Sequence, residues 1–129
     1  MQREFRALLT GSAAVTALLA AQAIDWGAPM QGTRPPRIAL HLIDNADGMT
    51  MQGPDGLWRG RVQVDVYDLT YGDTRAIADA VIGVLHGFRG GGFRGIILAQ
   101  TRDSHETGAS DRPFRISMDF MTNWSNDNA

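Results

Sequence analysis

The most constraining feature of this sequence is a strand-like segment followed directly by an amphipathic helical pattern, within residues 61–88. In the segment RVQVDVYDL, Val62, Val64 and Val66 alternate with polar or aromatic residues. Successive side chains of a strand point to opposite faces, so this alternation predicts a strand with one buried and one wetter face. The chain therefore needs a second element to cover the apolar face.

We expect that cover to be a helix beginning after Thr70. The Thr70 hydroxyl suits an N-cap, and Asp73 lies where the positive end of a helix favours a carboxylate. The run Gly90-Gly91-Gly92 predicts the end of the helix. Between them, apolar residues recur at spacings of three and four: Ile77, Val81, Val84, Leu85 and Phe88. This stripe can lie across the apolar face of a sheet, which buries both surfaces.

Three more strands are predicted, at 38–43, 95–101 and 113–122, and two short helices precede them all. Residues 25–36 are rich in glycine and proline and predict a connecting loop. The order α-α-β-β-α-β-β indicates an α+β fold, with a mostly antiparallel four-stranded sheet and helices packed on one face. The 129 residues fit one domain, with a helix pair at 2–24, the sheet and main helix at 37–122, and a loose C-terminal end at 123–129.

The first 24 residues allow three interpretations. A basic start, an apolar run and the A-x-A form of Ala21-Gln22-Ala23 are typical of a cleaved export signal. A membrane-spanning helix fits less well, because polar residues interrupt the run. The third interpretation is two short helices broken at Gly11, with Ser12 capping the second. Their apolar stripes would be Phe5, Leu8 and Leu9, then Val15, Leu18 and Leu19. We expect Leu18→Asp or Leu19→Asp to prevent folding.

Composition and charge exclude several classes of protein. Twelve basic and fourteen acidic residues give a net charge of −2, without the positive field of a dedicated nucleic-acid binder. The absence of cysteine excludes disulfides, thiolate nucleophiles and cysteine-bound zinc.

No catalytic, metal-binding or cofactor-binding residues emerge from the sequence. His41, His86 and His105 lack the short spacings of a zinc site. The run GFRGGGFRG follows a helix, whereas a phosphate-binding loop precedes one. A titratable cluster around His105 lies in a glycine-bearing connection, which does not hold groups in place for catalysis. We therefore expect neither an enzyme nor a cofactor.

Two long connections and the open strand edges indicate a protein that interacts with other proteins. The stretch from Asn45 to Trp58 is predicted as a long loop that carries Met49, Met51, Leu57 and Trp58. A second, charged connection spans Asp103 to Arg112. Open strand edges and inserted loops are common means of forming rings and filaments.

The order of elements and one central segment resemble a known family. The segment is GPDGLWRGRVQVDVYDLTYGDTRAIADAVIGVLHGF, followed by a glycine break, an isoleucine strand and the terminal strand FRISMDFMTNW. The helix pair and the run Pro35-Pro36-Arg37-Ile38 before the first strand also fit. Nearly the whole chain thus resembles the small tail-completion or tail-terminator proteins of long-tailed phages and phage-like gene transfer agents.

The resemblance implies a structural protein at the neck or tail end of the particle, assembled in the host cytoplasm without a membrane. It implies a ring, usually a hexamer, that caps the tail tube, stops its polymerisation and joins the tail to the head connector. DNA would pass through the ring without sequence-specific binding. The candidate contacts with neighbouring copies, the tube protein and the connector are Met49, Met51, Leu57, Trp58, Arg59, Asp103, His105, Glu106 and Arg112.

Three alternatives stay open at this point. A head-proximal stopper or connector subunit would share the same element order. An exported small binding domain would follow if residues 1–23 were a cleaved signal. A hydrolase using His105, Glu106 and Asp111 is the third.

Overall fold

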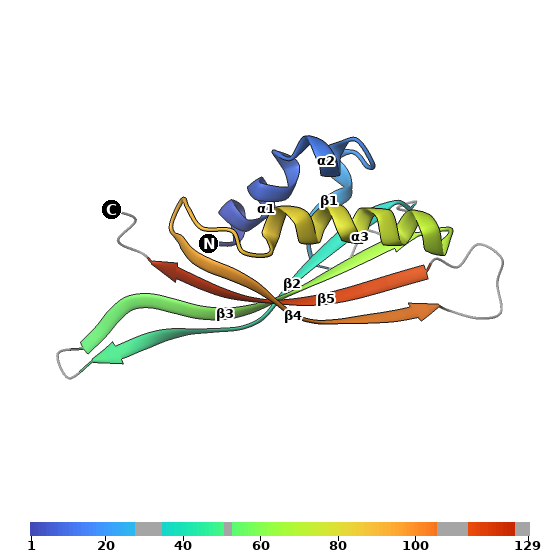
Figure 1. Ribbon diagram of the computed structural model, residues 1–129. Helices are drawn as coiled ribbons and strands as arrows, with labels where there is room; N and C mark the ends of the chain where they lie inside the picture. Colours follow the sequence, from blue (N-terminus) through green and yellow to red (C-terminus); the bar gives the residue numbers. More distant parts are fainter. Residues whose placement is uncertain (28–34, 51–52, 106–113, 126–129) are drawn as a thin grey trace.

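The computed structural model describes residues 1–27, 35–50, 53–105 and 114–125. Three helices lie on one face of a twisted sheet, and the chain's two longest strands extend beyond the others as a ribbon (Figure 1). The elements in chain order are α1 Gln2–Thr10, α2 Ala13–Thr16, the 3-10 turn η1 Ala21–Ala23, β1 Ile24–Trp26, β2 Arg37–Thr50, β3 Gly53–Asp68, α3 Tyr71–Leu85, β4 Phe93–His105 and β5 Phe114–Ser125.

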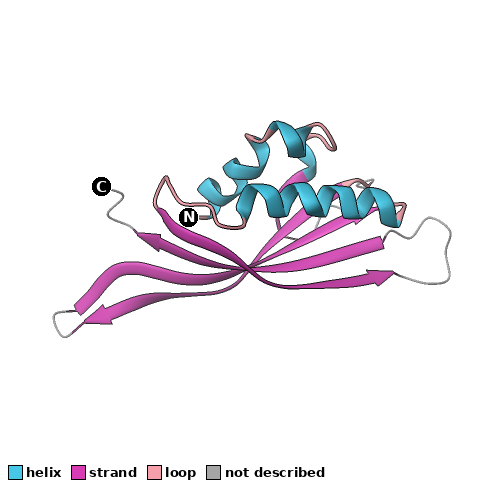
Figure 2. Cartoon of the chain, in the orientation of Figure 1, coloured by secondary structure: helices cyan, strands magenta, loops and turns pink. Residues whose placement is uncertain are grey.

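The sheet has five strands in the order β1-β2-β3-β5-β4. β1 pairs parallel with β2, whereas the other three neighbouring pairs are antiparallel. The α+β class and the placement of helices on one face are therefore confirmed (Figure 2). The expected four-stranded, mostly antiparallel sheet is corrected to a mixed, five-stranded one, because Ile24–Trp26 forms a strand where the end of the helix pair and the start of the connecting loop were predicted.

The main helix and the sheet form the core that the sequence predicts. Val62, Val64 and Val66 are fully buried beneath α3. The Thr70 hydroxyl accepts a hydrogen bond from the Asp73 amide at 3.1 Å, which confirms the predicted cap. The helix ends at Leu85, before the glycine run that was expected to stop it, and the chain then turns through His86. Full burial of a valine side chain, relative to leaving it exposed, contributes about 1.5–3 kcal/mol.

The N-terminal segment packs into the same core. Phe5, Leu9 and Val15 are fully buried, and the Arg6 Nε donates to the Ile24 carbonyl at 2.7 Å. Gly11 follows the last residue of α1, as predicted. Ser12 occupies the N-cap position of α2, but its side chain makes no capping hydrogen bond there.

The second helix is shorter than its apolar stripe suggested, because α2 stops at Thr16. Leu19 is buried with 6% of its surface exposed, whereas Leu18 is exposed at 42%. The expectation that Leu18 completes the core is therefore wrong: both leucines follow the end of α2, and there only Leu19 of the two turns its side chain into the core.

The predicted long loop at 45–58 is also corrected. Most of this segment belongs to the ribbon of β2 and β3, which pair from Asn45↔Gly60 to Thr50↔Gly53. The ribbon contains register shifts between Leu42 and Asp44 and between Asp47 and Met49, and these hide the strand alternation in the sequence. At the other end of the chain, β5 continues to Ser125, so the first three residues of the expected loose end are strand. Residues 126–129 lie outside the described residues.

Candidate functional site

The open face of the sheet, defined here as the face turned away from α1, α2 and α3, carries a buried polar network. Asp65, Ser117 and Asp119 lie on this face at 2%, 2% and 5% exposure. They alternate along β3 and β5 with core residues such as Val64 and Met118, which explains their direction. Other side chains of the open face cover them, in place of a helix.

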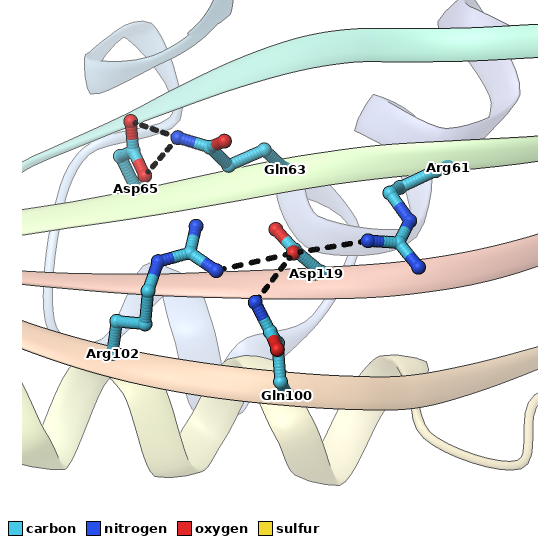
Figure 3. A network of polar contacts seen from close by, with 6 residues as sticks. All are labelled: Arg61, Gln63, Asp65, Gln100, Arg102 and Asp119. Carbon is cyan, nitrogen blue, oxygen red and sulfur yellow. Dashed lines mark hydrogen bonds and ion pairs between the residues drawn. The ribbon is translucent and has the colours of Figure 1, made fainter.

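Asp119 is the centre of this network (Figure 3). Its Oδ2 accepts hydrogen bonds from Gln100 Nε2 and Arg102 Nη1 on β4, each at 3.2 Å. On the other side it forms an ion pair with Arg61 Nη1 on β3 at 3.5 Å. The Oδ1 atom of Asp119 and the Oγ of Ser117 are buried and have no hydrogen-bond partner among the described residues. One carboxylate thus joins three adjacent strands.

A second carboxylate lies towards the other edge of the same face. Gln63 Nε2 donates to both oxygens of Asp65, at 2.9 and 3.0 Å, as Figure 3 shows. His41 Nε2 on β2 lies 3.6 Å from the Asp65 Oδ2. Nearby, the Arg37 guanidinium stacks 4.4 Å from the centre of the Tyr67 ring.

The network is suited to holding strands together rather than to catalysis. Arg61 on β3 and Gln100 and Arg102 on β4 all bind the Oδ2 atom of Asp119, so this carboxylate links neighbouring strands. In the described part of the chain, no group of three or more His, Cys, Asp or Glu residues is placed to hold a metal ion. No described helix is long and apolar enough to cross a membrane.

An exposed apolar pair borders the network. Ile97 on β4 lies directly opposite Met121 on β5, and both side chains are among the large exposed hydrophobic residues. Arg61 lies opposite Met121 on the next strand, so the pair adjoins the arginine that contacts Asp119.

One group of the predicted contact residues lies at the ribbon end of the sheet. Leu57, Trp58 and Arg59 pair with Ser125, Trp124 and Asn123 of β5. Leu57 and Trp58 are half-buried, while Arg59 is exposed. Met49 is further out, where its backbone pairs with Pro54, and Met51 lies outside the described residues.

The other predicted group lies at the opposite end. Asp103 and His105 are on the last part of β4 and pair with Ile116 and Phe114. Asp103 is exposed, and its Oδ2 accepts a hydrogen bond from the Tyr71 hydroxyl at 3.0 Å. This bond raises the pKa of the Tyr71 phenol above its ordinary value. Glu106, Asp111 and Arg112 lie outside the described residues.

The two groups are therefore not one site. On β5, the partner of His105 is Phe114 and the partner of Trp58 is Trp124, ten residues later. A strand rises about 3.3 Å per residue, so the two ends are about 33 Å apart. The sequence did not identify the network between them, although aspartate within a strand pattern is a recognisable signal because strands are poor in it.

Comparison with known proteins identifies the family to which this arrangement belongs. The family model for Tail completion protein gp17 matches residues 3–124. The chain belongs to the tail completion protein gp17 family. The resemblance stated from its sequence is thereby confirmed, and a member of this family is a structural phage tail protein, not an enzyme.

A solved structure supports the same fold. A chain in a structure entitled "Virion of native gene transfer agent (GTA) particle" matches with a TM-score of 0.72 and 20% sequence identity, covering 98% of this chain and 95% of that one. No curated protein matches the chain.

Proposed function

We propose that this tail completion protein forms a ring, a hexamer, at the end of the tail tube, where it stops tube polymerisation and joins the tail to the head connector. The observation that carries the proposal is the family match over residues 3–124. The likeness to a chain of a gene transfer agent virion agrees with a place in the tail end of such a particle. DNA passes through the ring without sequence-specific binding, in keeping with the net charge of −2.

The separation of the two predicted contact groups suggests how one ring serves two partners. A subunit between a tube and a connector needs two contact surfaces on opposite sides. The ribbon end, with Leu57, Trp58 and Arg59, and the β4 end, with Asp103 and His105, are at opposite ends of β5. We assign one partner to each end, with the strands running roughly along the ring axis.

The main test is a particle that lacks this protein. Without the cap, tubes should grow past their normal length and carry no heads when viewed by negative-stain electron microscopy. Normal-length tails joined to heads in its absence would overturn the proposed function.

A second test separates the two ends. Arg59→Glu and Asp103→Arg each reverse an exposed charge at one end of the sheet. Each should abolish association with one partner, measured by co-sedimentation with purified tube or connector, and leave the other intact. Ala76→Glu, on an exposed position of α3, is the control and should affect neither. Loss of both partners with either variant would contradict the assignment of one partner per end.

A further inference from the structure

Two edges of the sheet have backbone groups that no other described strand pairs with. On one side, β1 covers β2 only at Ile38, Ala39 and Leu40, and Gly27 N donates to the Leu40 carbonyl just beyond. The rest of β2, from Leu42 to Thr50, has no strand on its outer side within the described residues. Such an edge is a template for pairing with another chain.

On the other side of the sheet, the turn after α3 hydrogen-bonds to the outer backbone groups of the first half of β4. Gly87 N donates to the Ile96 carbonyl at 2.7 Å, and His86 Nδ1 accepts from the Leu98 amide at 3.0 Å. Along an antiparallel strand, residues whose backbone N–H and C=O groups point to the paired strand alternate with residues whose backbone groups point away from it. We call the second kind outward-facing. Beyond the bulge at Leu98/Gln100, the outward-facing positions are therefore Thr101 and Asp103. No hydrogen bond from the described residues reaches their backbone from the outer side.

The two edge strands run in opposite directions, as antiparallel pairing between two copies requires. β2 is antiparallel to β3, β3 to β5, and β5 to β4, so β4 runs opposite to β2. Two copies in the same orientation, side by side, therefore bring β4 of one antiparallel to β2 of the next, with all helices on the same side. Because the contact uses two different surfaces of each copy, it is heterologous, and it closes into a ring when the strands are inclined to the ring axis, as they are in a closed β-barrel.

Alternation and charge select the register. Along β2, the outward-facing positions after Leu40 are Leu42 and, beyond the bulge at Leu42/Asp44, Asn45. Pairing Thr101 with Asn45 places Asp103 at Leu42 and sets Arg102 opposite Asp44. Both of these charged residues are exposed. Both lie on the open face: Arg102 reaches Asp119 there, and Asp44 pairs with Arg61 across β2 and β3. Opposite charges directly across a strand pair are favourable.

We infer that neighbouring copies associate by antiparallel pairing of β4 with β2, with Thr101 of one copy opposite Asn45 of the next. The inference deepens the proposed function, since it supplies the contact between ring subunits, and it rests on that function for the ring itself.

Cysteine cross-linking of the full chain tests the register. The chain has no cysteine, so Asn45→Cys and Thr101→Cys introduce the only thiols. Within one copy, these positions are separated by about 14 Å across β3 and β5 and by about 13 Å along the strands, too far for a disulfide. The double variant should give a ladder of covalent multimers on oxidation, whereas a mixture of the single variants should give dimers only. An assembled ring that does not cross-link would overturn the pairing and leave the proposed function intact.

A backbone variant tests the edge itself. Proline at position 101 removes an N–H that points to the neighbouring copy and is not part of the β4–β5 ladder. Thr101→Pro should weaken self-association at least tenfold by mass photometry, while Thr101→Val, which keeps the N–H, should assemble as the unaltered chain does. Equal assembly of both variants would overturn the inference. Monomers of the unaltered chain, even with tube ends present, would instead contradict the proposed ring.

Discussion

Gly92 lies against the face of Trp124 so closely that no side chain fits between them. A Cβ at this position would lie 2.6 Å from the Cη2 and Cζ3 atoms of the Trp124 ring. Gly92 also has φ 99°, and its carbonyl accepts a hydrogen bond from the Ser125 amide at 2.9 Å. The contact joins the turn before β4 to the end of β5. There the Trp124 ring also packs edge-on against the Phe93 ring, with 4.8 Å between the ring centres.

We expect Gly92→Ala to lower the free energy of unfolding by about 2–4 kcal/mol, from backbone strain at positive φ and from overpacking against Trp124. Urea unfolding followed by tryptophan fluorescence measures the change. Gly95→Ala is the matched control, because nothing lies within 4 Å of its added Cβ, and it should change stability by less than about 0.5 kcal/mol. Equal effects of the two variants would contradict the close contact.

Two adjacent leucines should respond oppositely to the same substitution. Leu19→Asp places an unpaired carboxylate in the core and should cost more than about 4 kcal/mol, enough to prevent folding. Leu18→Asp should leave a folded protein within about 1 kcal/mol of the unaltered chain, because Leu18 is 42% exposed. Soluble yield and circular dichroism distinguish the two outcomes. An insoluble Leu18→Asp variant would show that the exposed position is covered in the folded protein.

Removing the central carboxylate of the open face should weaken the joint between three strands. Asp119→Ala leaves Gln100, Arg102 and Arg61 without their common acceptor, and should cost about 1–3 kcal/mol. Thermal unfolding provides the measurement. Asp79→Ala removes an exposed helical ion pair with Arg75 and should cost only about 0.3–0.5 kcal/mol, so a similar loss in both variants would rule out a special role for Asp119.

The bond between Tyr71 and Asp103 predicts a pH dependence at alkaline pH. Because the hydrogen bond to Asp103 raises the pKa of Tyr71 in the folded state, its stabilising contribution is fully present below pH 10.0. It is lost as the pH rises through the raised value. The chain has two tyrosines, so in a Tyr67→Phe background the ultraviolet titration reports Tyr71 alone. Adding Asp103→Asn should shift that titration to lower pH, and an unchanged titration would contradict the bond.

The sequence by itself determined the elements whose signals are local. The alternation of Val62, Val64 and Val66 predicted a strand, and the Thr70 hydroxyl predicted the start of α3, because side-chain direction and capping depend on neighbouring residues alone. Gly11 likewise predicted the end of α1. The α+β class follows from the order of these elements, and so did the resemblance to the family.

Only the tertiary structure decided the features that depend on distant partners. β1 has three residues and exists because Ile38–Leu40 offers it a parallel edge, which no local pattern reveals. The ribbon at 45–58 is held by pairing across register shifts that break the alternation. Asp119 is buried because Gln100, Arg102 and Arg61 converge on it from two other strands. A sequence records which residues alternate, but strand neighbours far apart in the chain determine which edge is free and which charge is buried.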